Sequence, residues 1–364
     1  MHSPTHLLSL LLVRLHHKAK ALRSLRKRRH VAPDFSPVHY SYYLQHTPEF
    51  GVEHKLLSNN VLQLRKGKNV QNVYLGSFLD FDGRATLMIA SDKVLCSTML
   101  KEAGIPVPRH AVLPSGDYRN AMAFKRTING PIVIKPARHT ADGIGVFLRP
   151  ESSASIWYAA HCAALYGEEM VVEEYFEGTN YRLLFCEDRF LSACARLPSC
   201  VVGDGIRTIR ELIAMENRGR RKQGDYLPYS RETRPILYEI LISPDLKRQL
   251  RKQGYTLKSI PHKGDKVFLQ DVCHWFRGGR YEDVTDILSS EFVRVGRRAA
   301  DVLGIKFAGV DLIAKDITRP APGTYAINEV NTSPSLLIHY EVQNQANLRP
   351  VAREILSMMF GEVE

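Results

Sequence analysis

The sequence predicts a mixed α/β or α+β protein built from several lobes. Helical and extended segments alternate along the chain, several extended segments are arranged as hairpins, and 364 residues exceed what one small core needs. With 44% hydrophobic and 24% charged residues, the composition is that of an ordinary globular protein, and no apolar run is long enough to span a bilayer. The six cysteines are scattered without a CxxC pair, which argues against a zinc site or a disulfide scaffold and favours a reducing, cytoplasmic location.

The net charge of +12 is unevenly distributed. Residues 14–29, "RLHHKAKALRSLRKRR", carry many cations and no acid, and they follow the leucine-rich run "LLSLLLVRL". A signal peptide has its positive charge before the apolar run, so this order does not fit secretion. We interpret residues 1–34 as a basic arm and linker that contacts an anionic surface or a partner. A solvated helix or a loosely ordered tail is the alternative.

Three lobes are expected after this arm. Residues 35–90 form the first, in which "NNVLQLRKGKNVQNVYLG" gives short strands around a glycine turn. Residues 91–172 form the central lobe. It starts with a helix in "ASDKVLCSTMLKEAGIPVP" and contains the buried-type strand "GPIVIKPA". The helix can be capped by Ser91 or Asp92, and its expected apolar stripe is Leu95, Met99, Leu100 and Ala103.

Residues 173–364 are expected to form the third lobe. A hairpin over residues 181–198 turns at Glu187-Asp188, and Thr208 and Glu211 have the spacing of a capping box. A polar, basic stretch from residue 216 to about 285 reads as an insertion or lid. The chain then finishes with a hairpin formed by "FAGVDLIA" and "YAINEVN".

This last hairpin carries an unexpected group of polar side chains. Side chains alternate between the faces of a strand, so Glu329 and Asn331 share one face while Val330 and Ile327 suit the buried side. With Asp311 on the partner strand, two carboxylates and an amide oxygen form the all-oxygen set that Mg²⁺ prefers, and Mn²⁺ is an alternative ion. A set of surface polar residues on a half-exposed hairpin is the competing interpretation.

A Mg²⁺ site with few protein ligands implies substrate phosphates, and therefore cations that bind them. Lys135 ends the apolar run "PIVI", and Lys93 lies in the first turn of its helix, where a cation opposes the helix dipole. Ordinary exposed lysines are the alternative. In "ARHTADGIGV", Gly143 and Gly145 can bring backbone N–H groups against phosphate oxygens, although Asp142-Gly143 equally suits a hairpin turn.

Two further pairs of residues are candidates for the same site. Glu173 and Glu174 close an apolar strand whose backbone can meet an adenine edge, unless they are simply solvated glutamates at a strand end. Arg182 and Arg196 lie on the two arms of the hairpin. They can face a phosphoryl group or a substrate carboxylate, or pair with acids on the surface.

Taken in order, these segments resemble the ATP-grasp superfamily, and most closely the ATP-grasp domains of cyanophycin synthetases and of fused glutamate–cysteine ligase/glutathione synthetases. The resemblance covers roughly residues 55–345. The segments that carry it are "VLQLRKGKNV", "SDKVLCSTMLKEAGIPVP", "PIVIKP", "VVEEYFEGTNYRLL", "ARLPSCVVGDGIRTIRELI", "GGRYEDVTD", "AGVDLIAKD" and "INEVNTSPSLLIH". It implies an ATP-grasp fold, with two antiparallel-sheet lobes enclosing ATP behind a small N-terminal lobe. The implied chemistry is ATP-dependent, ADP-forming ligation of a carboxylate to an amine.

The resemblance also assigns residues to the ligands. The residues that it assigns to ATP are Lys93, Lys135, Gly143, Gly145, Glu173, Glu174, Phe176 and Asn180. The residues that it assigns to Mg²⁺ are Asp311, Glu329 and Asn331. The candidate catalytic residues are Lys135, Arg182 and Arg196, with Arg196 as the contact to the phosphate or acyl phosphate.

The sequence departs from the family pattern at several positions. Asn180 stands where the family has a ribose-binding acid, and Ser335 replaces a glycine. Gly309 stands two residues before Asp311, at the position where the related D-alanine–D-alanine ligases have an arginine before the metal aspartate. Because the metal trio and the lysines are retained, we expect ATP use with a different substrate pocket. Arg277, Arg280 and Ser335 are speculative substrate contacts.

The function favoured by the sequence is a ligase that acts on amino acids or small peptides and assembles as a homo-oligomer. An ATP-grasp kinase that stops at phosphorylation is the second hypothesis. A non-catalytic basic protein, attached to an anionic partner through residues 14–29, is the third. Retention of the metal trio and both lysines disfavours this last hypothesis.

Overall fold

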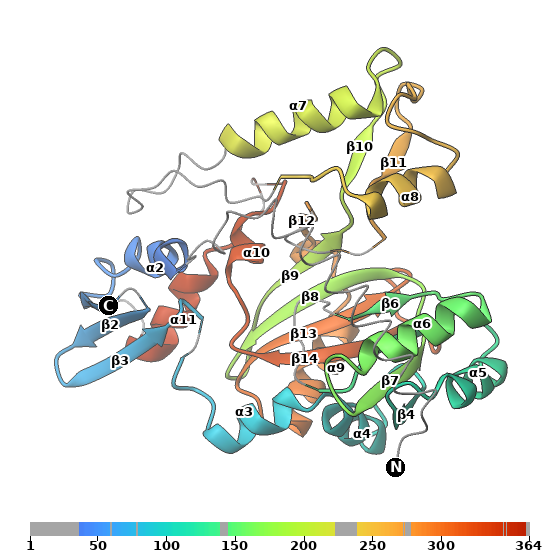
Figure 1. The fold of residues 1–364 in the computed structure, drawn as a ribbon. Coiled ribbons are helices and arrows are strands. Elements are labelled where there is room, and N and C mark those ends of the chain that lie inside the picture. Colours follow the sequence, from blue (N-terminus) through green and yellow to red (C-terminus); the bar gives the residue numbers. More distant parts are fainter. Residues whose placement is uncertain are drawn as a thin grey trace.

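A computed structural model describes residues 36–58, 60–77, 79–138, 145–222, 239–271, 273, 278–344, 346 and 348–361, with the backbone alone at 36–39, 221 and 222. These residues form four sheets, of three, four, five and two strands, in which every strand pair is antiparallel. Helices and sheets are layered as the α+β class requires (Figure 1). None of the described helices is long and apolar enough to cross a membrane.

The three-stranded sheet forms the N-terminal lobe. Strands β1 (Glu53–Ser58), β2 (Val61–Lys66) and β3 (Asn69–Tyr74) follow one another, and Gly67 turns between β2 and β3 with a φ of +58°. Helices α2 (Ser36–Leu44) and α11 (Val351–Phe360) share a hydrophobic core with this sheet. Helix α11, expected in the third lobe, therefore completes the first.

Helices α3 (Arg84–Ser91) and α4 (Lys93–Glu102) lead into the central lobe. Asp92 caps α4, because its carboxylate accepts hydrogen bonds from the N–H groups of Val94 at 3.0 Å and Leu95 at 3.1 Å. The expected apolar stripe was wrong at Leu95, which is 42% exposed. Cys96 and Leu100, four residues apart, fill the buried face instead.

The four-stranded sheet of the central lobe has the order β4-β7-β5-β6. Its strands are β4 (His110–Pro114), β5 (Ile132–Pro136), β6 (Phe147–Leu148) and β7 (Glu169–Glu174), and its helices are α5 (Tyr118–Thr127) and α6 (Ser153–Ala163). Ile132 and Ile134 of β5 pack in one core with residues of these two helices. Alternation along β5 then places Val133 and Lys135 on the opposite face of the sheet.

The five-stranded sheet has the order β12-β9-β8-β13-β14. Its strands are β8 (Thr179–Cys186), β9 (Arg189–Leu197), β12 (Arg280–Asp283), β13 (Phe307–Ala314) and β14 (Tyr325–Thr332). Helix α9 (Ser290–Val302) packs on one face, where Phe292 joins Leu183 and Val310 in the core. The expected hairpins at residues 181–198 and 307–331 are confirmed. After β14, the short helix α10 (Leu337–Tyr340) runs near β9 and β12.

A small subdomain projects from this sheet, at the top of Figure 1. It contains β10 (Cys200–Val202), α7 (Ile209–Lys222), α8 (Pro244–Lys252) and β11 (Lys266–Phe268), which share a hydrophobic core. We call residues 200–268 the lid subdomain. It begins earlier than the expected residue 216, because α7 and β10 pack with α8 and β11. The capping box is confirmed, since the N–H of Thr208 donates to Glu211 Oε2 at 2.8 Å and the N–H of Glu211 to Thr208 Oγ1 at 3.4 Å.

Candidate active site

One cleft of about 890 Å³ is lined by residues of both larger sheets, of α4 and of the lid subdomain. The expected site residues that line it are Lys93, Lys135, Glu173, Glu174, Phe176, Asn180, Arg182, Arg196, Arg280, Asp311, Glu329, Asn331 and Ser335. Gly145 is not in the described lining. Its φ of +74°, and the Pro136 ring 2.8 Å from where a Cβ would lie, require glycine there for backbone reasons. Gly143 and Arg277 lie outside the described residues.

The proposed metal ligands lie side by side on the last hairpin. Asp311 of β13 is directly opposite Glu329 of β14, and Gly309 is opposite Asn331. The register shifts beside Asp311, because Asn328 is an extra residue in β14 that has no partner in the ladder. This bulge lets Ile327 and Val330, three residues apart, both reach the hydrophobic core.

Asp311 is the electrostatic centre of the site. Its side chain is 5% exposed, and it accepts hydrogen bonds from Arg182 Nε, from Arg182 Nη2 at 3.1 Å and from Arg196 Nη1 at 2.9 Å. Burial would raise the pKa of Asp311, but the charges of the two guanidinium groups outweigh it and hold the pKa below its ordinary value. The Asp311 charge in turn raises the pKa of Arg196. Asp311 is therefore an ionised carboxylate with two cationic partners.

Gly309 makes room for this arrangement. A Cβ on Gly309 would lie 2.7 Å from Pro334 Cβ and 2.9 Å from Arg182 Nη1, closer than packed atoms approach. Arg182 reaches over Gly309 from β8, the strand next to β13.

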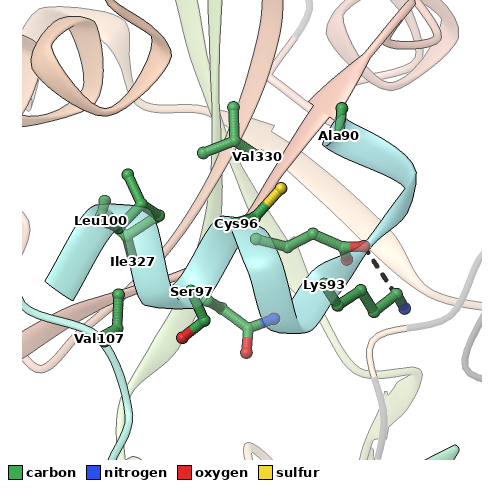
Figure 2. A pocket seen from close by; sticks show the side chains of 10 residues that line it. Ala90, Lys93, Cys96, Ser97, Leu100, Val107, Ile327 and Val330 are labelled. Carbon is green, nitrogen blue, oxygen red and sulfur yellow. Dashed lines mark ion pairs between the residues drawn. The ribbon is translucent and has the colours of Figure 1, made fainter. Parts of the chain in front are cut away.

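The two candidate phosphate-binding lysines are paired in the same way. Lys93 Nζ, at the start of α4, lies 3.4 Å from Glu329 Oε1 (Figure 2). Lys93 and Glu329 also border a space of about 10 Å³ that Cys96, Leu100 and Val330 help to close, with room for one water molecule at most. Lys135 Nζ lies 2.8 Å from Glu173 Oε1, and both side chains are largely buried.

The end of β7 has the character of a site for a planar ring. Val133, Val146 and Leu148 give the cleft an apolar wall there. The N–H of Glu174 already donates to the carbonyl of Arg109 at 2.8 Å. Because an amino group donates hydrogen bonds, an adenine amino group would meet the carbonyl oxygen of Glu174.

The donor set fits a divalent cation that also takes ligands from a substrate. The described residues hold no group of three or more His, Cys, Asp or Glu that could hold a metal ion. Asp311, Glu329 and Asn331 together supply only two carboxylates and one amide. The Asn331 Nδ2 donates to the carbonyl of Gly309 at 3.4 Å, so its amide oxygen remains for a metal. Such a partial set of oxygen donors suits Mg²⁺ completed by phosphates and water.

Arg280 is engaged at the base of the lid subdomain. Its Nη2 lies 3.0 Å from Glu216 Oε2 of α7 and donates to the carbonyl of Cys200 at 3.1 Å. A substrate carboxylate would have to compete with Glu216 for this guanidinium, so the substrate role of Arg280 stays a prediction. Lys266 and Phe268, which also line the cleft, were missed. The alternation in "KVF" was the available signal, because it places both side chains on one face.

Comparison with known proteins identifies relatives of this chain. No family model matches the chain. It is 29% identical over 307 residues to cyanophycin synthetase from Synechocystis sp., which is 84% of this chain and 34% of that protein. It is 30% identical over 327 residues to the glutathione biosynthesis bifunctional protein GshAB of Streptococcus mutans, which is 87% of this chain and 42% of that protein.

The structure aligns with the crystal structure of a bifunctional glutathione synthetase from Pasteurella multocida with a TM-score of 0.63 and 26% identity, over 90% of this chain and 43% of that chain. The chain has the ATP-grasp fold. The resemblance inferred from the sequence is confirmed. The ATP-grasp chain spans less than half the length of each of these relatives.

Proposed function

We propose that this ATP-grasp chain is an ATP- and Mg²⁺-dependent ligase that joins a carboxylate to an amine, releasing ADP and phosphate. The single observation that carries the proposal is the convergence of two carboxylates, an amide and four cations on one cleft. Amino acids or small peptides are the proposed substrates. The likeness to cyanophycin synthetase and to the glutathione biosynthesis protein supports this class.

The proposed roles follow from charge. A carboxylate that approaches a triphosphate brings one anion to another, so catalysis requires positioning and neutralisation. Lys93 and Lys135 would hold phosphates, and Arg196 would stabilise the phosphoryl group in transfer. Asp311, Glu329 and Asn331 would hold Mg²⁺, which supplies further neutralisation when it is bound.

The carboxylate oxygen attacks the γ-phosphorus, the bond to ADP breaks, and an acyl phosphate forms. The amine nitrogen then attacks the acyl carbon, and phosphate leaves with the bonding electrons. The nitrogen gives its proton to the departing phosphate, which balances the step. Arg182 and Arg196 would stabilise the anionic oxygens during both transfers.

The cellular location, oligomeric state and partners of the enzyme are also proposals. None of the six cysteines, all of which are described residues, forms a disulfide, and five are buried, which suits a reducing cytoplasm. A homo-oligomeric state, and contact of residues 1–34 with an anionic surface or partner, stay predictions, because residues 1–34 lie outside the described residues.

The purified full chain, incubated with ATP, Mg²⁺ and a panel of amino acids and dipeptides, tests this function. A ligase releases ADP only when an acid and an amine are both present, and a product with the condensed mass appears. A stable phosphorylated product that accumulates without any amine, and no condensed product when an amine is added, would identify a kinase and refute the ligase. No nucleotide binding would refute both enzymes.

A further inference from the structure

Each cation expected to bind phosphate is held by an acid expected to bind metal or nucleotide. Lys93 pairs with Glu329 at 3.4 Å and Lys135 with Glu173 at 2.8 Å. Arg182 and Arg196 both pair with Asp311. Each of these four cations of the cleft is therefore paired with one of three carboxylates.

This pairing has opposite consequences for the two ligands when each arrives alone. A divalent cation finds Glu329 and Asp311 already neutralised and meets the repulsion of Lys93 and the arginines. A nucleotide alone has to draw cations away from these acids, which would take a partner from the buried Asp311, and a buried charge with less compensation is costly. When both arrive together, the metal takes the acids while the phosphates take the cations.

The two arginines are not equivalent in this exchange. Arg182 is 12% exposed, bonds Asp311 through two nitrogens and occupies the space that Gly309 leaves open. Arg196 is 25% exposed and bonds Asp311 through one nitrogen at 2.9 Å. Arg196 is thus the guanidinium that can leave, and Arg182 the one that stays.

We propose that metal and nucleotide bind this cleft by charge exchange, in which Lys93 and Arg196 pass from Glu329 and Asp311 to the phosphates as the metal takes their places. The proposal rests on the proposed function and adds a coupling between its two ligands. It has an unusual consequence. Removing a nucleotide-binding cation should strengthen binding of the metal alone, because the carboxylate that it held is released.

The test measures binding and not turnover. Free Mn²⁺ is followed by electron paramagnetic resonance during titration of the full chain without nucleotide, and ADP binding is followed by calorimetry with and without Mn²⁺. Lys93→Met should bind Mn²⁺ alone about threefold more tightly, as for a partly exposed pair. Arg196→Gln should bind it about tenfold more tightly, because its pair is more buried. Both variants should bind Mn²⁺-ADP more weakly than the wild type.

Two controls locate the effect. Lys306→Met removes a lysine from a pair of similar length, 3.5 Å from Glu187 on the surface, and should leave Mn²⁺ binding unchanged. Adding Glu329→Gln to Lys93→Met should abolish the gain in Mn²⁺ affinity, which places that ion in this cleft. Circular dichroism and melting temperature confirm that each variant is folded.

Equal Mn²⁺ affinity of wild type, Lys93→Met and Arg196→Gln would overturn the proposal, because the cations would then not restrain the metal ligands. That result would leave the ligase intact if the substrate panel still gives condensed products. Conversely, charge exchange without amide formation would reject the ligase and support the coupling. The two failures are therefore distinguishable.

Discussion

At the scale of single residues, the site depends on a glycine that leaves room for a large charged side chain. Because Gly309 has no side chain, Arg182 can lie against β13 at this position. Asp311 then gathers two arginines from two different strands, β8 and β9. The sequence predicted that these three residues belong to one site. It did not predict that they pair, because the pairing depends on a strand order found only in the folded sheet.

Replacement of Gly309 by alanine tests this close packing. The added methyl group would meet Pro334 Cβ at 2.7 Å and Arg182 Nη1 at 2.9 Å, so we expect the free energy of unfolding to fall by about 1–3 kcal/mol. Urea denaturation measures the change. Gly130→Ala is the matched control, since no atom lies within 4 Å of its Cβ position, and it should be close to neutral. Equal stability of the two variants would contradict the packing described here.

His339 gives a pH dependence to stability. It is 1% exposed, its Nδ1 lies 2.6 Å from Ser192 Oγ, and burial, with a smaller effect of Arg182, lowers its pKa to about 3. Between pH 6.5 and about 3, His339 is protonated in the unfolded chain but not in the folded chain. Stability therefore falls as the pH is lowered, by up to about 1.4 kcal/mol per pH unit.

Urea unfolding at pH 7, 6 and 5 measures this slope, and His339→Gln should flatten it. Asp311 acts in a lower window, because its pKa is depressed below 3.8 and its contribution is lost only as the pH falls through that depressed value. An identical slope in wild type and His339→Gln above pH 5 would contradict the assignment to His339.

At the scale of elements, alternation along β14 predicted that Glu329 and Asn331 share a face with Asp311 across the hairpin, and the register agrees. Alternation alone does not explain why Ile327 and Val330, at odd spacing, are both buried. The bulge at Asn328 explains it, and one extra residue in a ladder leaves no local signature in the sequence. Most of the residues predicted to bind ATP were assigned through the resemblance to a family, because the strand patterns alone did not identify them.

A partly buried ionic group lies at the base of the lid subdomain. Glu216 of α7 accepts from Arg220 Nε at 3.0 Å and lies 3.0 Å from Arg280 Nη2 of β12. Glu216→Ala would leave two guanidinium groups facing each other, and Arg220 is 2% exposed. We expect a loss of about 3 kcal/mol in the free energy of unfolding, together with easier proteolysis of the lid subdomain.

Asp301→Ala is the control for this variant. It breaks the exposed pair between Asp301 and Arg297 within α9, which should cost less than about 1 kcal/mol. A comparable, small effect of both substitutions would show that Glu216 does not hold the lid subdomain to the five-stranded sheet.

At the scale of the whole molecule, contacts between distant segments could not be predicted from the sequence. The Nδ2 of Asn69 donates to the carbonyl of Met359 at 2.7 Å, which joins the first sheet to the last helix across nearly the whole chain. No periodicity in either segment encodes that contact. The lid boundary was misplaced for the same reason, since α7 and β10 belong to the subdomain through packing and not through composition.

The basic arm gives a prediction at this scale. Every described residue that lines the cleft lies between Lys93 and Gln343, so deletion of residues 1–33 should leave turnover within about twofold of the full chain. Steady-state kinetics and the mass of the assembly in solution check this expectation. A tenfold or greater loss of turnover, with the fold and the assembly unchanged, would give the arm a role in catalysis.

The central claim is that a carboxylate is activated by phosphoryl transfer before the amine attacks. The most direct measurement uses an acid substrate from the panel with both carboxylate oxygens replaced by oxygen-18. Activation as an acyl phosphate transfers one labelled oxygen to the released phosphate for each amide bond formed, which mass spectrometry of the phosphate detects. Amide formation with unlabelled phosphate would contradict the account.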